Sequence, residues 1–256
     1  MIDLHCHILS ELDDGPKTIE ESLLMAEAAV KEGITSIVAT PHYAHPSFSK
    51  NEAKRVKVKV KELNQELSVR NIPLIIYPGH ELRIHGELVE ELTNDTALTM
   101  AGLGTYVFIE FSSNHVPRYA ASLFYQLQVA GYYPVIVHPE RNSELVQNPT
   151  LIYDFVKSGV YTQITASSLT GDNGKNIKKF TEQLIESNLT HFLASDAHNT
   201  TTRPFRMKEA YEEMKQEFGR ATVELFQENA ERLLENRALI VDDPEPIRRK
   251  KILGIF

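Results

Sequence analysis

Short apolar stretches rich in β-branched residues recur along the chain, separated by longer stretches in which apolar positions repeat with helical spacing. Short apolar runs are typical of buried strands, and the longer periodic segments are typical of helices that pack on a sheet. The predicted strands are residues 2–5, 36–40, 74–77, 106–110, 134–138, 161–165 and 191–195. The predicted helices are residues 19–31, 52–70, 118–130, 151–158, 175–186, 206–218 and 221–235.

This alternation is typical of repeated βα units, in which helices cover a parallel sheet. The length of 256 residues allows one α/β barrel or two small domains. Since no linker or change in composition interrupts the pattern, we expect one closed or nearly closed parallel barrel, a single domain over residues 1–256 with 242–256 as a C-terminal tail. An open doubly wound sheet competes, but no dinucleotide-binding glycine fingerprint supports it. Thr18 and Glu21 predict a capping box for the first helix, and Gly33 predicts its end.

Composition limits the classes of function. The net charge of −8 argues against a general binder of nucleic acid or of an anionic membrane, since both need a basic surface. Cys6 is the only cysteine, which excludes an internal disulfide and suits a reducing cytoplasm. The sequence shows neither a signal-peptide pattern nor an apolar run of about 18 residues. We therefore expect a soluble cytoplasmic protein without direct membrane insertion.

The first predicted strand carries the most informative chemistry. His5 and His7 lie two positions apart, and alternate side chains of a strand point to the same face. Two neutral imidazoles that converge in this way can bind a divalent transition metal. Asp14 follows on a turn within reach of the same place. Cys6 should point away from the histidines into the packing, so we do not expect it to be a nucleophile.

Histidine or acidic residues lie at the carboxyl ends of six of the seven predicted strands. In an α/β barrel these ends share one rim, where active sites are built. The nine candidate metal ligands are His5, His7, Asp14, His42, Glu81, Glu110, His138, Asp196 and His198. A single residue of this kind is more often a capping or hydrogen-bonded group, but independent coincidence at six strand ends is hard to accept. Since a catalytic metal uses three or four protein ligands, nine predict two or three ions. Imidazole with carboxylate suits manganese, iron or zinc, and phosphoester hydrolysis is the natural chemistry of such a site.

The motifs resemble those of the polymerase and histidinol phosphatase (PHP) superfamily. The matching segments are His5-Cys6-His7, Thr40-Pro41-His42, Glu81, His138 and Asp196-Ala197-His198. A closer resemblance, over residues 1 to about 236, is to the PHP-type protein-tyrosine phosphatases of Gram-positive bacteria that are encoded with capsular or extracellular polysaccharide genes. It rests on Ile2-Asp3-Leu4-His5-Cys6-His7, Asp13-Asp14-Gly15-Pro16, Glu110-Phe111-Ser112, His138-Pro139-Glu140-Arg141, and Ser195-Asp196-Ala197-His198-Asn199 followed by Arg203.

This resemblance implies a distorted (β/α)7 barrel of the PHP type with three divalent metal ions, manganese before iron or zinc. The implied ligand sets are His5, His7, Glu81 and Asp196 for one ion, Asp14, His42 and His198 for a second, and Glu81, Glu110 and His138 for a third, with Glu81 bridging. Arg141 and Arg203 match the two arginines thought to steady the phosphate, for which the planar guanidinium is well suited.

The resemblance also implies the reaction and the partner. We expect a metal-dependent protein-tyrosine phosphatase that acts on the tail of a bacterial tyrosine kinase controlling polysaccharide synthesis. The alternatives are a small-molecule phosphatase such as histidinol-phosphate phosphatase, a nuclease, which the net charge of −8 disfavours, and an adaptor that binds the kinase tail without hydrolysis. The Cys-x5-Arg loop of cysteine-dependent tyrosine phosphatases is absent. The sequence leaves a homo-oligomer open.

The remaining histidines have weaker predictions. His80, beside Glu81, is a candidate outer hydrogen-bond donor or substitute ligand, and His45 is expected on a loop, where a solvent-exposed role is favoured over a contact with the substrate. His85 and His115 are expected at the surface or the rim. His191 lies at a strand start, which is the wrong rim for chemistry.

Overall fold

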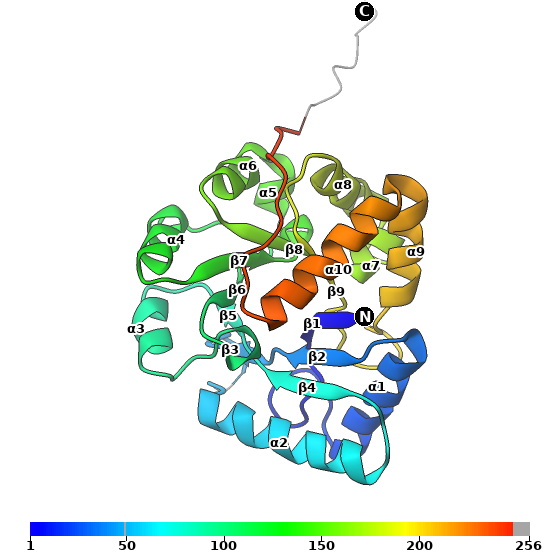
Figure 1. The fold of residues 1–256 in the computed structure, drawn as a ribbon. Coiled ribbons are helices and arrows are strands. Elements are labelled where there is room, and N and C mark those ends of the chain that lie inside the picture. The colour runs from blue at the N-terminus through cyan, green and yellow to red at the C-terminus, as the bar shows by residue number, and fades with distance from the viewer. Residues whose placement is uncertain (49, 248–256) are drawn as a thin grey trace, which may run out of the picture.

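Parallel β-strands form the centre of the molecule, and helices surround them (Figure 1). The computed structural model describes residues 1–48 and 50–247. Within these residues the strands are β1 (Ile2–Cys6), β2 (Ser36–Ala39), β3 (His42–Tyr43), β4 (Ile75–Pro78), β5 (Glu81–Arg83), β6 (Tyr106–Glu110), β7 (Tyr133–Val137), β8 (Tyr161–Thr165) and β9 (Phe192–Ala194). All seven predicted strands are present, with ends that differ by at most one residue.

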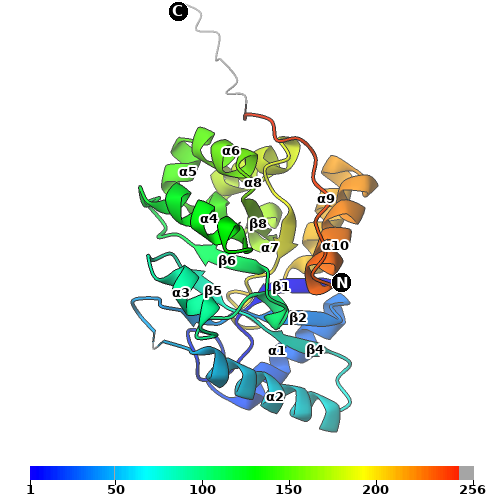
Figure 2. The same cartoon turned by 60° about the vertical axis from the view of Figure 1, so that its left-hand side comes forward.

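The helices alternate with the strands, as the sequence pattern predicts. They are α1 (Ile19–Glu32), α2 (Ala53–Val69), α3 (Leu88–Thr93), α4 (Ala120–Val129), α5 (Ser143–Gln147), α6 (Thr150–Lys157), α7 (Ala166–Thr170), α8 (Lys175–Glu186), α9 (Met207–Phe218) and α10 (Arg220–Leu234), with the 3-10 turns η1 (Met100–Gly102) and η2 (Pro139–Arg141). In both views α1 and α2 cover the side of β2 and β4, whereas α4, α5 and α6 cover the side of β7 and β8 (Figures 1 and 2). The helices α3, α5 and α7 were not predicted, because five or six residues are too few to establish a helical period.

The first helix begins at the predicted residue and ends one residue later than predicted, before the expected glycine cap. The hydroxyl of Thr18 accepts a hydrogen bond from the Glu21 amide at 3.3 Å, and Gly33 ends the helix with a left-handed φ of 88°. The Glu21 carboxylate accepts from the amide of Lys17 at 2.6 Å. The return bond of the expected capping box therefore goes to the residue before the N-cap.

The chain bends after β2 and after β4, and each bend leads into a short strand that was not predicted, β3 and β5. Backbone pairing divides the strands into two sheets. The sheet orders are β1-β2-β4 and β3-β5-β6-β7-β8-β9. β3 continues the path of β2 after Thr40-Pro41, where Pro41 has no amide hydrogen to donate. β5 continues β4 after Gly79, where an added Cβ would meet Cγ1 of Val38 at 2.7 Å. Glycine thus permits a close approach of the two strands at the second bend.

The expected α/β class with parallel sheets is confirmed, but the described residues form no closed sheet. The first and last strands are nevertheless neighbours, because Cys6 and Ala197 form a parallel bridge and the Asp196 amide donates to the His5 carbonyl at 2.8 Å. At the other junction β5 pairs with β6, whereas in the described part of the chain β4 pairs only with β2. Near the carboxyl ends of the strands, backbone pairing thus runs without a break from β3 to β9. The break in pairing lies beside β4, near the amino ends.

Successive strand residues belong to two separate hydrophobic cores. Phe108 and Val135 lie in an inner core among the strands, whereas their neighbours Val107 and Ile136 lie in an outer core under the helices. This alternation is the two-residue period of a strand that is buried on both faces. Residues of η1 and α10 also belong to the inner core. These two elements cover its amino-terminal end and leave the carboxyl ends of the strands free to form a site.

The described part of the expected C-terminal tail packs along the helical layer. The Asn188 side chain donates to the Asp243 carbonyl at 3.0 Å, and the Glu245 amide donates to the Ser187 carbonyl at 2.8 Å. The basic and apolar end of that tail, residues 248–256, lies outside the described residues. In the part of the chain that the structure covers, no helix is both long and apolar enough to span a bilayer.

Candidate metal centre

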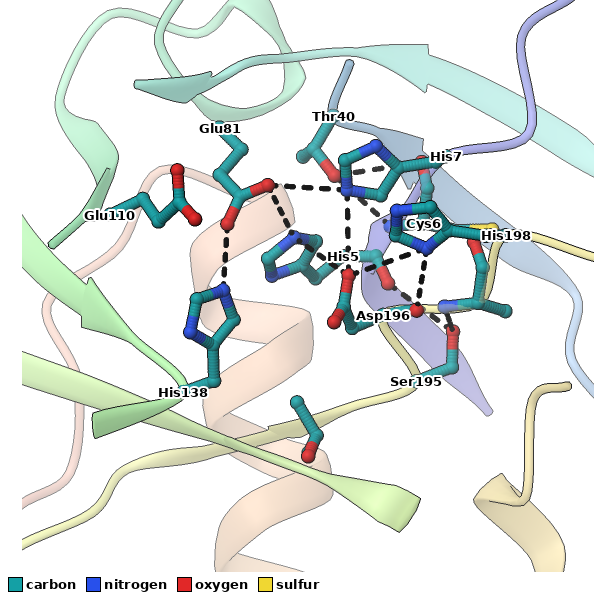
Figure 3. A network of polar contacts seen from close by, with 12 residues as sticks. His5, Cys6, His7, Thr40, Glu81, Glu110, His138, Ser195, Asp196 and His198 are labelled. Carbon is teal, nitrogen blue, oxygen red and sulfur yellow. Dashed lines mark hydrogen bonds and ion pairs between the residues drawn. The ribbon is translucent and has the colours of Figure 1, made fainter. Parts of the chain in front are cut away.

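All nine candidate ligands lie together at the carboxyl ends of the strands, as Figure 3 shows for seven of them. His5 belongs to β1, His42 to β3, Glu81 to β5 and Glu110 to β6. His138 directly follows β7, and Asp196 and His198 follow β9. His7 and Asp14 complete the set from the segment after β1. Residues from almost the whole length of the chain therefore meet at one place.

An irregularity in β1 positions the two histidines. Its pairing with β2 shifts register between Asp3 and Cys6, so that Leu4 lies in the inner core while the adjacent His5 faces the ligand cluster. Such bulges re-aim side chains next to functional sites. Cys6 is fully buried in the outer core, and its thiol contacts the Ala197 carbonyl at 3.5 Å. The thiol therefore lies away from the cluster, as the strand period predicts.

Two further ligands stand on left-handed backbone. His138 has a φ of 35° and Asp196 a φ of 53°. Residues other than glycine rarely adopt positive φ, and where they do the strain is often stored at a functional site. The His138 amide donates to the Gln163 carbonyl at 2.7 Å, and the Asp196 amide donates to the His5 carbonyl at 2.8 Å. These bonds to neighbouring strands hold both turns in place.

The ligand atoms fall into three overlapping groups. The groups are His7 with Asp14, His42 and His198; His5 with His7 and Glu81; and His42 with Glu81 and Glu110. Asp196 joins the second group, since its Oδ1 lies 3.4 Å from Nε2 of both His5 and His7. Nε2 of His138 lies 2.7 Å from Oε1 of Glu81. Glu81 is therefore shared among the groups, as a bridging carboxylate would be.

The facing atoms lack hydrogen-bond partners. Among the described residues, the buried and unpartnered atoms of the cluster are Nε2 of His5, His7 and His198, Nδ1 of His42, Oε2 of Glu81 and Glu110, and Oδ1 of Asp196. An unsatisfied buried polar atom costs about 1–3 kcal/mol, so a set this large indicates a missing common partner. Nδ1 of His42 lies 3.0 Å from Oε2 of Glu81, and Nε2 of His7 lies 3.2 Å from the same oxygen. Ligands at about 2.1 Å from one ion stand about 3.0–3.4 Å apart, so these residues fit divalent metal ions.

Hydrogen bonds to the other imidazole nitrogens orient the rings. Nδ1 of His5 bonds to Oε1 of Gln163 at 2.9 Å, and Nδ1 of His7 bonds to Oδ2 of Asp13 at 2.7 Å. Nδ1 of His198 bonds to the Asp196 carbonyl at 2.9 Å. When these Nδ1 atoms donate, each Nε2 keeps its lone pair for an ion.

The orienting role of Asp13 and Gln163 was not predicted from the sequence. Asp13 stands directly before the candidate ligand Asp14 in the Asp13-Asp14-Gly15-Pro16 motif. This adjacency was a signal that one carboxylate could bind a metal ion while the other orients a neighbouring ligand. Gln163 is a fully buried polar residue in the middle of β8, the only predicted strand without a ligand at its end. A buried amide in an otherwise apolar position needs a partner, and that was the available signal.

The carboxylates make the centre strongly attractive to cations. Burial alone would lower the pKa of His5, but the charges of Glu81 and Asp196 outweigh it and raise that pKa. Burial would likewise raise the pKa of Asp13, yet the charge and hydrogen bond of His7 lower it to about 2. Burial and the nearby charge of Glu81 raise the pKa of Glu110. A field that favours a proton on His5 also favours bound metal cations.

The two candidate arginines meet at one ligand. The guanidinium groups of Arg141 and Arg203 both donate to Oδ2 of Asp196, and Arg203 also donates to Oδ2 of Asp14 at 3.2 Å. Arg141 is further held by the hydroxyls of Thr165 at 3.0 Å and Ser167 at 3.1 Å. Both guanidinium groups line the cavity of about 230 Å³ above the ligand cluster. Both guanidinium groups thus bind Oδ2 of Asp196, whereas Oδ1 of the same carboxylate lies near His5 and His7.

A buried carboxylate supports this arrangement. Oε1 of Glu140 accepts hydrogen bonds from the amide and the hydroxyl of Thr165, both at 2.9 Å. Thr165 also bonds to Ser168 at 2.7 Å. The residue before Arg141 therefore fixes a hydroxyl that Arg141 contacts.

The other histidines lie outside the three ligand groups. His80 is fully buried and accepts a hydrogen bond from the Leu98 amide at 2.9 Å, and burial lowers its pKa to about 3, so its contacts do not support the expected role as a donor or ligand. His45 lines the cavity, which was the less favoured of the two roles considered for it. His85 bonds to Glu91 at 2.8 Å, and the exposed His115 bonds to Glu144 at 2.9 Å. His191 is buried at the start of β9.

Fold and donor set define the class of this protein: a parallel α/β fold with a candidate metal centre of histidines and carboxylates at the carboxyl ends of its strands. Two solved structures, a β-aspartyl dipeptidase of Fervidobacterium islandicum and a lactonase of Listeria monocytogenes, share this fold with TM-scores of 0.55 and 0.53 at 14% identity. A family model described as "Capsular polysaccharide synthesis, CpsB/CapC" matches residues 1–235, and the chain belongs to that family.

Named relatives cover nearly the whole chain. The tyrosine-protein phosphatase YwqE of Bacillus subtilis is 46% identical over 256 residues, which span 100% of both chains. The tyrosine-protein phosphatase CpsB of Streptococcus agalactiae serotype III is 34% identical over 242 residues, which span 92% of this chain and 99% of that one. A crystal structure from work on YwqE of B. subtilis and CpsB of Streptococcus pneumoniae, described as unique metal-dependent tyrosine phosphatases, has a TM-score of 0.94 at 46% identity and covers 97% of this chain and 100% of that chain.

Proposed function

We propose that this chain is a metal-dependent protein-tyrosine phosphatase whose substrate is a bacterial tyrosine kinase of capsular or extracellular polysaccharide synthesis. One observation carries the reaction type: two arginine forks and a histidine and carboxylate cluster face the same cavity. That combination suits a tetrahedral dianion, which needs both metal cations and planar donors. The names of the relatives supply the tyrosine ester as substrate.

The proposed ligands would hold three divalent ions, with manganese preferred over iron and zinc. His5, His7, Glu81 and Asp196 would hold one ion, Asp14, His42 and His198 a second, and Glu81, Glu110 and His138 a third. Bound ions of this kind supply Lewis-acid stabilisation of a phosphoryl group and lower the pKa of water. The geometry adds His7 to the group of Asp14 and His42 to the group of Glu110, so each of these imidazoles is within reach of two of the ligand groups.

The chain's own residues would do the rest of the work. Arg141 and Arg203 would bind the non-bridging phosphate oxygens and orient the ester for in-line attack by water. Asp196 would hold both guanidinium groups in place, since its Oδ2 already accepts from each of them. In the reaction the bond from phosphorus to the phenolic oxygen breaks, and the tyrosine leaves with a proton as phenol.

We also propose that the two sheets are parts of one seven-stranded barrel in a single domain. β2 with β3, and β4 with β5, would each count as one bent strand, and the bridge from Cys6 to Ala197 would close the circle. The inner core, which takes residues from β1, β2, β6, β7 and β9, supports this interpretation.

A substrate panel tests the function. The full chain, loaded in turn with Mn²⁺, Fe²⁺ or Zn²⁺, is assayed on a phosphotyrosine peptide, histidinol phosphate and single-stranded DNA, with Glu81→Gln as the control for contaminating phosphatases. We expect the peptide to have the highest kcat/KM. Faster turnover of histidinol phosphate or DNA would overturn the proposed substrate, and tight peptide binding without turnover would indicate an adaptor.

A further inference from the structure

Aromatic side chains lie together at the edge of the candidate metal centre. The rings of His42, His45 and Phe48 stack on one another, with centroids 4.7 Å apart for His42 and His45, 5.2 Å for His42 and Phe48, and 5.0 Å for His45 and Phe48. The Phe48 ring is nearly parallel to the imidazole of His42, at 8°. Since His42 is a proposed ligand, the stack begins at the metal centre itself.

The segment that carries these rings is fixed at several points. Ala44 adopts a left-handed φ of 57°, which turns the chain directly after β3. The amides of Ser47 and Phe48 donate to Nδ1 and to the carbonyl of His45, both at 3.2 Å. The Asn51 side chain donates to the His42 carbonyl at 2.9 Å. The rings are therefore held in position before any ligand binds.

His45 and Phe48 line the same cavity as the arginines and the ligands. They follow β3, whereas Arg141 and Arg203 follow β7 and β9, so the aromatic rings and the arginines come from different strands. Both rings are only half-buried, so part of their apolar surface faces the cavity. The phosphate-binding groups and the aromatic groups thus occupy different parts of one site.

We propose that His45 and Phe48 form an aromatic wall that binds the ring of the leaving group and makes the site selective for aryl over alkyl phosphate esters. This inference rests on the proposed function, because it takes the phosphoryl group to lie between the arginines and the metal ligands. In an aryl ester the ring is bonded directly to the ester oxygen, so it must lie beside the phosphate. Both rings of the aromatic wall stack on His42, which is a proposed metal ligand. The wall therefore lies beside the place where the ring of a bound aryl ester would be.

The physical basis of the selectivity is the stacking of rigid rings. Aromatic pairs contribute favourably beyond the area that they bury, and a ring with few rotors loses little entropy when it binds. An alkyl phosphate such as phosphoserine offers the wall only a methylene group. The same wall therefore adds affinity for a tyrosine ester and little for a serine ester.

Phosphonates test the wall separately from leaving-group chemistry. Benzylphosphonate replaces the ester oxygen of phenyl phosphate with a methylene group, and ethylphosphonate is its alkyl counterpart. Dissociation constants are measured by calorimetry on the metal-loaded full chain, on Phe48→Ala, Phe48→Leu and His45→Ala, and on Ser47→Ala. Ser47 is the matched control, because it is exposed in the same segment and does not line the cavity.

We expect the wild-type chain and Ser47→Ala to bind benzylphosphonate about tenfold more tightly than ethylphosphonate. In Phe48→Ala this ratio should fall below about threefold, while affinity for ethylphosphonate and metal content stay within about twofold of wild type. Phe48→Leu should keep the fold and still lose ring selectivity. An unchanged ratio in all three wall variants, or an equal loss for both phosphonates, would overturn the aromatic wall. A wild-type chain that prefers benzylphosphonate but does not hydrolyse phosphotyrosine would instead count against the proposed function alone.

Discussion

Replacing Arg141 tests how the candidate site uses its charges. Arg141 donates through one terminal nitrogen to Asp196 and through the other to Thr165 and Ser167. In Arg141→Ala, Asp196 keeps its 2.9 Å bond from Arg203 and Thr165 keeps its bonds to Glu140. The substitution should therefore leave the fold and the metal ligands intact and remove only a phosphate donor.

The expected loss is large because the donor acts on charge that builds up in the transition state. Removing one preorganised donor of this kind costs about 10²–10³ in rate, or about 2.7–4 kcal/mol. Arg141→Lys should recover only part of this. A single ammonium cannot reach Asp196 and Thr165 at once as the two terminal nitrogens of Arg141 do. If it retains one charged hydrogen bond worth about 1.5 kcal/mol, the lysine variant should be about tenfold faster than the alanine variant.

Steady-state kinetics on a phosphotyrosine peptide measures these effects, with elemental analysis and thermal unfolding of each variant. Arg206→Ala is the matched control, since Arg206 has a side-chain exposure of 42%, close to the 41% of Arg203, but pairs with Asp172 and Glu209 away from the cavity. Arg203→Ala should also be slow, and Arg206→Ala should not. Near wild-type rates for Arg141→Ala and Arg203→Ala with full metal content would refute the reasoning.

Three further predictions concern metal, thiol and pH. A chelator should abolish phosphatase activity and lower the thermal midpoint, and Mn²⁺ at about 100 times its dissociation constant should restore about 2.7 kcal/mol of stability; an unchanged midpoint in calorimetry would contradict this. Cys6→Ala and thiol alkylation should leave kcat/KM and metal content largely intact, because the Cys6 side chain is 0% exposed and lies away from the cluster. Burial lowers the pKa of His191 to about 4 in the folded chain. As pH falls, His191 therefore binds a proton in the unfolded chain before it does so in the folded chain, and stability is lost from about pH 6.5 towards pH 4. Urea titrations of the chelated protein at pH 7.5 and 5 should show about 2 kcal/mol of this loss. The loss should be absent in His191→Asn, which retains an acceptor for the Thr162 amide. Equal losses in the wild-type chain and in His191→Asn would rule out this role of His191.

The sequence alone predicted the elements and most of the candidate site, because both follow from short periods. The two-residue strand period placed His5 and His7 on one side and Cys6 on the other, and the structure has this arrangement. Strand ends were recognisable from apolar runs, so residues as distant as His42 and His198 could be assigned to one rim. The assignment of individual ligands to individual ions stays a prediction.

Features set by contacts between distant segments could not be predicted. The bends at Pro41 and Gly79 divide the pairing into two sheets, and Gly79 is required only because Val38 approaches it from another strand. Gln163 orients His5 across 158 residues of sequence, and no local pattern joins the two. The shared anchoring of Arg141 and Arg203 at Asp196 likewise appears only when β7 and β9 are in place.

The bond between Asp3 and Ser195 has a consequence for the order of folding. The buried Asp3 carboxylate accepts from the amide of Ser195 at 2.9 Å and from its hydroxyl, across 192 residues of sequence. Contacts of such separation close a very long loop, and folding rates fall as contacts become less local. During synthesis β1 cannot pair with the segment after β9, and His5 cannot contact Asp196, until nearly the whole chain has left the ribosome. The proposed ligand sets that include Asp196 or His198 would therefore be complete only late in translation, whereas the set of Glu81, Glu110 and His138 needs no residue beyond His138, directly after β7.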